Sequence, residues 1–64
     1  MKNAVRELRL QLGWTQQELG ARVGTSRQAI IAIENGRFDP SLPLAIKLSR
    51  ILKKSIEEIF FLDE

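Results

Sequence analysis

Few residues in this chain could perform enzyme chemistry. Histidine, cysteine and tyrosine are all absent from its 64 residues, which removes the commonest metal ligand, the usual proton shuttle near neutral pH and the thiolate nucleophile. The carboxylates fall mainly at helix-capping positions and do not converge in pairs, as general acid–base catalysis would require. We therefore predict that the protein is not an enzyme, with no catalytic residues, no metal site and no cofactor.

The remaining polar chemistry is hydrogen bonding and charge, and the charge is unevenly distributed. The net charge is only +2. Residues 1–37 nevertheless contain six Lys or Arg and three Asp or Glu, whereas residues 55–64 contain four acidic residues and no basic one. A basic half favours a polyanion as partner, although mixed charge is also typical of an ordinary solvated surface.

Length and composition predict one small globular domain, 1–64. The hydrophobic share of 44% and the charged share of 28% are typical of a folded chain, but the size is near the lower limit for an unaided core. No apolar run approaches the ~20 residues needed to span a bilayer, and no signal peptide is visible. We expect a soluble, cytoplasmic protein that is stabilised by packing, to which dimerisation can add.

Apolar residues at helical spacing predict an all-α fold of five short helices. Capping residues and glycines predict where each begins or ends. The predicted helices are 3–12, 16–23 and 27–34, one that begins after Ser41, and a short one after Ser55. Residues 61–64 are predicted to be a tail, and Trp14 to plug the core rather than to stack on bases.

The second and third of these helices have the pattern of a helix-turn-helix, at about 15–34. This motif needs a small residue where the helices cross, a glycine at the turn, and apolar residues that fix both helices to the first. Gly20 and Gly24 occupy the first two kinds of position. The apolar positions are Leu19, Val23, Ile30 and Ile33.

The segments TQQELG, VGTSRQAI, IENGRFDPSL and SIEEIF together resemble the phage repressor and Cro-like (XRE-type) family of helix-turn-helix regulators. The resemblance covers essentially the whole chain. It implies a compact five-helix, lambda-repressor-like fold in which helix 27–34 enters the major groove of double-stranded DNA. It also implies a sequence-specific transcriptional regulator, most simply a repressor on a pseudo-palindromic operator, which is associated with the nucleoid when bound.

The resemblance further implies which residues read bases. Arg27 and Gln28 match base-reading positions, and their side chains pair well with guanine and adenine, respectively. Ile31 and Ala32 depart from many relatives, which have polar residues at one or both positions. Apolar side chains there can contact thymine methyl groups, but Ile31 can equally pack under the following loop.

Other matching positions are implied to contact phosphates and to hold the helices together. Thr25 and Ser26 bind phosphate or cap the helix, and one hydroxyl cannot be assigned both roles from sequence. Arg9 and Glu34 match a family pair that ties the first helix to the end of the third. The implied phosphate-contacting residues are Gln16, Thr25, Ser26, Asn35 and Arg37.

One short recognition helix reads only a few base pairs, so we expect a homodimer on two half-sites. The C-terminal segment 55–64 is the predicted interface, with Phe61 as its main residue, although an aromatic residue there can instead cap the core. The predicted interface residues are Ile56, Ile59, Phe60, Phe61 and Leu62. The alternative function is an antitoxin or protein-interaction module that also binds DNA, which the short chain after the fifth helix disfavours.

Overall fold

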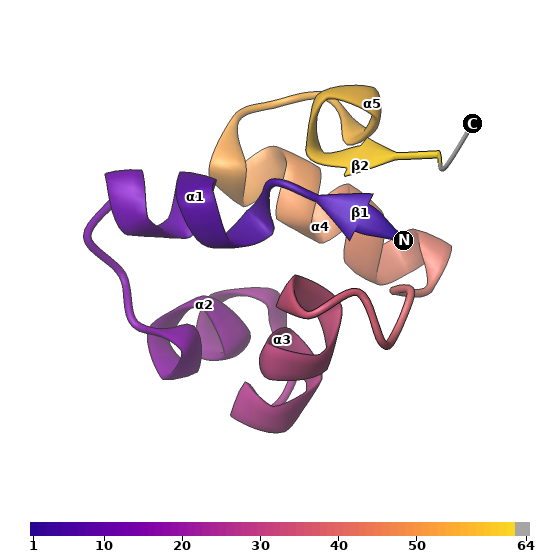
Figure 1. Cartoon of the computed structure of the whole chain (residues 1–64). Coiled ribbons are helices and arrows are strands. Elements are labelled where there is room, and N and C mark those ends of the chain that lie inside the picture. Colours follow the sequence, from indigo (N-terminus) through magenta and orange to yellow (C-terminus); the bar gives the residue numbers. More distant parts are fainter. Residues whose placement is uncertain (63–64) are drawn as a thin grey trace.

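The helices begin and end where the capping signals predict, with one exception. The computed structural model describes residues 1–62, and Figure 1 shows their arrangement. The helices are α1 (Val5–Gln11), α2 (Gln16–Val23), α3 (Arg27–Glu34), α4 (Leu42–Leu52) and α5 (Ile56–Ile59). The mostly helical fold class is therefore as predicted, and α2 and α3 have the predicted bounds.

Side-chain caps account for the sharp helix starts. At α2, the Thr15 hydroxyl accepts from the Glu18 backbone N–H at 3.0 Å, and the Glu18 carboxylate accepts from the Thr15 N–H at 3.1 Å. Ser55 and Glu58 form the same reciprocal capping box at α5. Such boxes satisfy N–H groups that have no partner within the helix.

The exception is α1, which spans Val5–Gln11 rather than the predicted 3–12. The Asn3 carboxamide oxygen accepts from the Val5 N–H at 3.1 Å, and its nitrogen donates to the Ile33 carbonyl at 2.8 Å. Asn3 therefore joins the start of α1 to the end of α3. Its own backbone is extended and lies in a strand.

That strand, β1 (Lys2–Asn3), pairs antiparallel with β2 (Phe60–Phe61). The pairing places Lys2 opposite Phe61 and Asn3 opposite Phe60, so both ends of the described chain lie side by side in Figure 1. The predicted tail at 61–64 is wrong for Phe61, whose backbone is fixed by this pairing. Residues 63 and 64 lie outside the described residues.

Every helix contributes side chains to the hydrophobic core. Trp14 packs against it as predicted, and the Arg22 guanidinium lies 4.1 Å from the centre of the Trp14 ring. The buried apolar residues that form the core cluster are Val5, Leu19, Val23, Ile30, Ile33, Leu48, Leu52 and Ile59. No helix within residues 1–62 is long and apolar enough to cross a membrane.

Gly20 and Gly24 make the crossing of α2 and α3 possible. A Cβ at residue 20 would lie 2.8 Å from the Thr25 carbonyl oxygen, closer than real Cβ atoms approach. Gly24 ends α2 in the left-handed conformation, with φ 74°, which glycine adopts without steric cost. Both glycines therefore do what the helix-turn-helix pattern requires of them.

Candidate nucleic-acid interface

The start of α3 presents polar side chains to solvent while the opposite side of the helix is locked into the core. Arg27 and Gln28 are exposed in its first turn, and Ile30 and Ile33 are 0% exposed. In Figure 1, α2 and α3 occupy the lower part of the molecule, and α5 and β2 the upper part. The base-reading residues implied by the resemblance therefore lie together on one accessible edge.

Ile31 and Ala32 lie one turn further along the same helix and are half-buried. Neither side chain belongs to the buried core cluster. Part of each surface therefore remains available for contact. This partial exposure is compatible with both interpretations of Ile31, contact with a base and packing under the loop.

An open hollow lies between α2 and the start of α3. It is lined by Gln17, Ala21, Thr25, Ser26, Arg27 and Gln28. The sequence prediction missed Gln17, which is exposed on α2 beside the two base-reading candidates. The family resemblance assigns a phosphate contact to its neighbour Gln16. Nothing in the sequence pattern marks Gln17 as a DNA-contacting residue.

The two hydroxyl residues before α3 differ in their hydrogen bonds. The Ser26 hydroxyl accepts from the Ala29 backbone N–H at 3.1 Å, so it caps α3. Thr25 is half-buried, and its backbone N–H donates to the Gly20 carbonyl at 2.8 Å. Capping uses the Ser26 oxygen as an acceptor, which leaves the hydroxyl proton available for donation.

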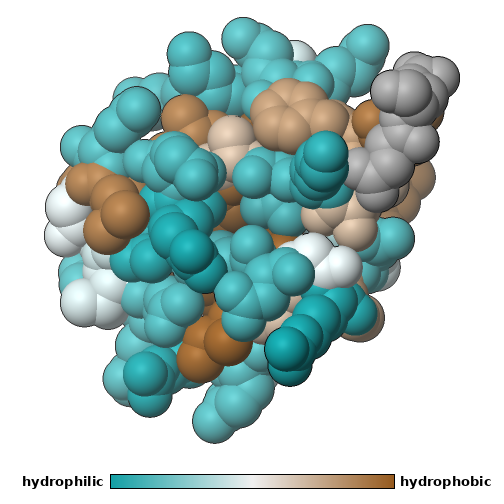
Figure 2. All heavy atoms as spheres, viewed as in Figure 1, coloured by the Kyte–Doolittle hydropathy of each residue, from teal (hydrophilic) through white to brown (hydrophobic). Residues whose placement is uncertain are grey.

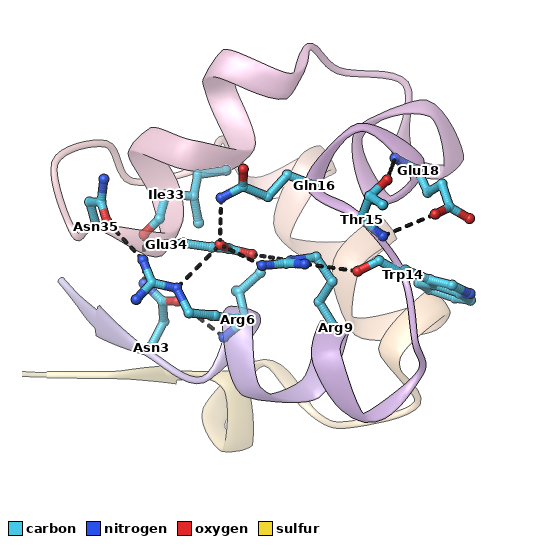
Figure 3. A network of polar contacts seen from close by, with 11 residues as sticks. Asn3, Arg6, Arg9, Trp14, Thr15, Gln16, Glu18, Ile33, Glu34 and Asn35 are labelled. Carbon is cyan, nitrogen blue, oxygen red and sulfur yellow. Dashed lines mark hydrogen bonds and ion pairs between the residues drawn. The ribbon is translucent and has the colours of Figure 1, made fainter.

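A buried carboxylate, that of Glu34, connects the first three helices (Figure 3). Arg9 of α1 donates to both of its oxygens, at 2.7 and 3.3 Å, and Gln16 of α2 donates to Oε1 at 3.1 Å. The Glu34 side chain is 0% exposed and that of Arg9 is 9% exposed. Arg9 also donates to the Trp14 carbonyl at 2.8 Å. The implied pairing of Arg9 with Glu34 is therefore present, with bidentate geometry.

These contacts decide the charge state of Glu34. Burial by itself raises the pKa of this carboxyl, but hydrogen bonds from Arg9, Gln16 and Arg6 and the positive charge of Arg9 outweigh it. The pKa of Glu34 is therefore below its ordinary value, and the residue is ionised at neutral pH. An ionised carboxylate keeps Gln16 and the two arginines in place.

The loop after α3 carries the other two predicted phosphate contacts. Asn35 and Arg37 are both exposed, and Gly36 between them has φ 73°. The Arg37 backbone N–H donates to the Ala32 carbonyl at 2.9 Å, which holds the loop against the end of α3. Arg6 of α1 donates to the Asn35 carboxamide oxygen at 2.9 Å.

The C-terminal segment only partly matches the predicted dimer interface. Ile59 is 0% exposed and belongs to the core, so its side chain is not available to a second chain. Ile56 and Phe60 are half-buried, whereas Phe61 and Leu62 are 42% and 70% exposed. The prediction is thus corrected for Ile59, because the short helix α5 packs on α4 and buries that side chain in the core cluster.

α4 also carries exposed apolar residues, which the sequence prediction missed. Leu42 is 68% exposed and Ile46 38% exposed. A small hollow beside them is lined mainly by apolar residues, namely Met1, Asp39, Pro40, Leu42, Ala45, Ile56 and Phe60. Figure 2 shows separate apolar patches among hydrophilic atoms on the visible face, one of them in the upper part, where α5 and β2 lie in Figure 1. The four exposed apolar residues Leu42, Ile46, Phe61 and Leu62 are together called the apolar surface below; Leu42 lines the small hollow, whereas Phe61 lines another hollow together with Asn35.

Known proteins resemble this chain in sequence along its whole length. An uncharacterized HTH-type transcriptional regulator of Methanothermobacter thermautotrophicus is 54% identical, covering 100% of this chain and 94% of that protein. The regulator YgzD of Bacillus subtilis is 45% identical, covering 100% and 97%. The competence pilus inhibition repressor of Acinetobacter baylyi is 39% identical, covering 95% of this chain and 56% of that protein.

Solved structures and a family profile agree with these relatives. The restriction-modification controller protein C.AhdI of Aeromonas hydrophila superimposes with a TM-score of 0.78 at 32% identity, covering 88% of this chain and 85% of that one. The profile described as Helix-turn-helix matches residues 5–59. The chain therefore belongs to the XRE-type helix-turn-helix family of DNA-binding transcriptional regulators.

Proposed function

We propose that this regulator reads a pseudo-palindromic operator through α3 in the major groove, and that it acts as a repressor. The observation that carries the proposal is the geometry of α3, whose apolar side is locked in the core while Arg27 and Gln28 are exposed in its first turn. A rigid helix that presents its N-terminal polar residues is how helix-turn-helix proteins contact base edges. The repressor of Acinetobacter baylyi among the relatives favours repression. The site of action is the cytoplasm, on nucleoid DNA.

Base specificity is assigned to the exposed residues of α3. Arg27 suits the O6 and N7 atoms of guanine, and Gln28 the N6 and N7 atoms of adenine. Ile31 and Ala32, half-buried one turn later, would meet thymine methyl groups. Gln17 lines the same hollow as Arg27 and Gln28 and stands beside them as a further polar contact.

Phosphate contacts are assigned to residues around α3. Gln16 uses one amide proton for Glu34, so its second proton can bind a phosphate oxygen. Arg37 is exposed and adds a positive charge after the helix. Thr25 and Ser26 lie at the α3 N-terminus, where backbone N–H groups and the helix dipole favour an anion. Such contacts fix the position of the protein on DNA without carrying sequence information.

A homodimer supplies the second recognition helix. The apolar surface, with Leu42 and Leu62 about two-thirds exposed, is the proposed interface. Burial of such residues against an identical surface is favourable and gives the two-fold symmetry that a pseudo-palindromic site requires. Ile56 and Phe60 border this surface and contribute their exposed parts.

Binding-site selection from random duplex DNA, followed by affinity measurements, tests the proposal. We expect a selected site with inverted half-sites. Gln28→Ala should weaken binding to that site by roughly 10- to 100-fold and leave binding to a scrambled duplex nearly unchanged. Arg37→Ala should weaken binding to both duplexes alike and lower the salt dependence by about one counterion.

Three results of this experiment would count against the proposal. They are no enrichment of any sequence, an unchanged preference in Gln28→Ala, or a loss of preference in Arg37→Ala. Ile31→Ala in the same selection separates the two roles of that residue. A lost thymine preference indicates base contact, and an unchanged profile indicates packing.

A further inference from the structure

Arg6 is a basic residue of α1 that the proposed DNA contacts do not include, yet it touches two residues at the end of α3. Its Nε lies 3.5 Å from Glu34 Oε1, and its Nη2 donates to Asn35 Oδ1 at 2.9 Å. Figure 3 shows the guanidinium lying between these two side chains. We propose that Arg6 is a positioning residue, which turns the Asn35 carboxamide so that its N–H₂ group donates to a DNA phosphate. This inference rests on the proposed function.

The chemistry of the two groups fixes the orientation of the amide. An asparagine side chain can present either its oxygen or its nitrogen, but a guanidinium has only donors. The atom that faces Arg6 must therefore be the oxygen. Within residues 1–62 the Asn35 nitrogen donates to no protein acceptor, so both of its protons remain available on the side away from Arg6.

The orientation of the Asn35 amide determines whether it can bind a phosphate. Its oxygens are acceptors, so a phosphate is bound by the N–H₂ end of an amide and repelled by the oxygen end. An exposed asparagine that nothing holds would populate both orientations and would lose side-chain freedom on binding. Arg6 removes the unfavourable orientation before DNA arrives.

Arg6 is itself held in place by the buried carboxylate. The Glu34 side chain is 0% exposed and is anchored by Arg9 at 2.7 Å. The ion pair with Glu34 fixes the Nε end of the Arg6 guanidinium, and the hydrogen bond to Asn35 fixes the other end. The Arg6 side chain is still 49% exposed, so its removal should leave the fold in place.

A double-mutant cycle with Arg6→Met and Asn35→Ala in the full chain tests the inference. Affinity for the selected duplex is measured at several salt concentrations, and urea unfolding verifies that each variant is folded. Lys2→Met is the matched control, because Lys2 is exposed, has the same charge and borders the same surface hollow as Asn35. The control measures how much affinity for DNA is lost when one positive charge is removed near Asn35 while the contact between Arg6 and Asn35 is kept.

We expect Arg6→Met and Asn35→Ala each to weaken binding about 3- to 10-fold more than Lys2→Met does. In the Asn35→Ala background, Arg6→Met should have no more effect than Lys2→Met. If Arg6→Met has its full effect in that background, Arg6 binds phosphate directly and the inference is wrong. If neither variant exceeds the control, Arg6 is structural only, which also overturns it.

The wild-type protein separates this inference from the proposed function. If the wild-type protein selects an operator but the effects of Arg6→Met and Asn35→Ala are additive, only the role of Arg6 is refuted. Wild type that shows no sequence preference overturns the proposed function and, with it, this inference.

Discussion

At Glu34, one buried carboxylate holds side chains from two other helices. The family resemblance predicted its pairing with Arg9, and the structure confirms it. The contacts from Gln16 and Arg6 were not predictable. A match to family positions indicates that Arg9 pairs with Glu34. Whether the side chains of Gln16 and Arg6 also contact Glu34 depends on how the helices pack.

Glu34 should make stability depend on pH. Because its pKa is lowered in the folded protein, Glu34 stabilises the fold above the pKa of the unfolded chain, and this contribution is lost as pH falls through the lowered folded value. We expect Glu34→Gln to reduce the free energy of unfolding at pH 7 by about 3 kcal/mol or more, since it leaves Arg9 buried without its charge partner. Below about pH 4.5 the difference between variant and wild type should shrink.

Urea unfolding at pH 7 and pH 3.5 provides the measurement. Glu18 and Glu58 also have lowered pKa values, owing to hydrogen bonds from Thr15 and Ser55, but they titrate in both proteins and cancel in the difference. Glu57→Gln, at an exposed position of α5, is the control. A stability difference for Glu34→Gln that is the same at both pH values would contradict this assignment.

At the scale of elements, the helices were the predictable part of the fold. Capping boxes at Thr15 and Ser55 are short-range signals that depend only on neighbouring residues, and both are present in the structure. The close approach at Gly20 was predictable for a similar reason, because a glycine inside a helix costs about 1 kcal/mol relative to alanine and needs an explanation.

The β1–β2 pair was not predictable from the sequence. Two-residue strands are too short to show the alternation that identifies strands, and their pairing joins Asn3 to Phe60 across nearly the whole chain. The same long-range contact explains why α1 begins late and why Phe61 is not part of a tail. Contacts between distant segments depend on the whole fold.

The exposure of the first turn of α3 was predictable, and the exposed apolar residues only partly so. Arg27 and Gln28 were identified by their place in a specific motif, and both are exposed. Leu42 and Ile46 lie in a helix, LPLAIKLSRIL, that is apolar on several sides. Periodicity alone therefore did not separate its exposed residues from its buried ones.

For the whole molecule, DNA binding and self-association are assigned to different surfaces. α2 and α3 form one part of the molecule, and the apolar surface lies on α4 and residues 61–62. We expect a dimer formed through the second surface to leave the first turn of each α3 helix accessible. Two linked contacts give higher specificity than one short helix can provide.

We expect charged substitutions on the apolar surface to separate the chains. Phe61→Glu and Leu42→Glu would each bury an unpaired charge in the dimer, so the dimer dissociation constant should rise by at least about tenfold and operator binding should weaken. Leu10→Glu is the control, because Leu10 is also well exposed, at 60%, but lies on α1. Unchanged sedimentation and operator affinity in both test variants would refute the proposed interface.

Titration of the isotope-labelled protein with its selected duplex, followed by backbone amide chemical shifts, tests most directly whether α3 reads DNA. The predicted result is that the largest changes fall at residues 16–17, 25–32 and 35–37, with small changes in α5. Saturation at one duplex per two chains is also expected. Changes concentrated on α4 and α5, with residues 25–32 unaffected, would contradict the assignment of α3 as the recognition helix.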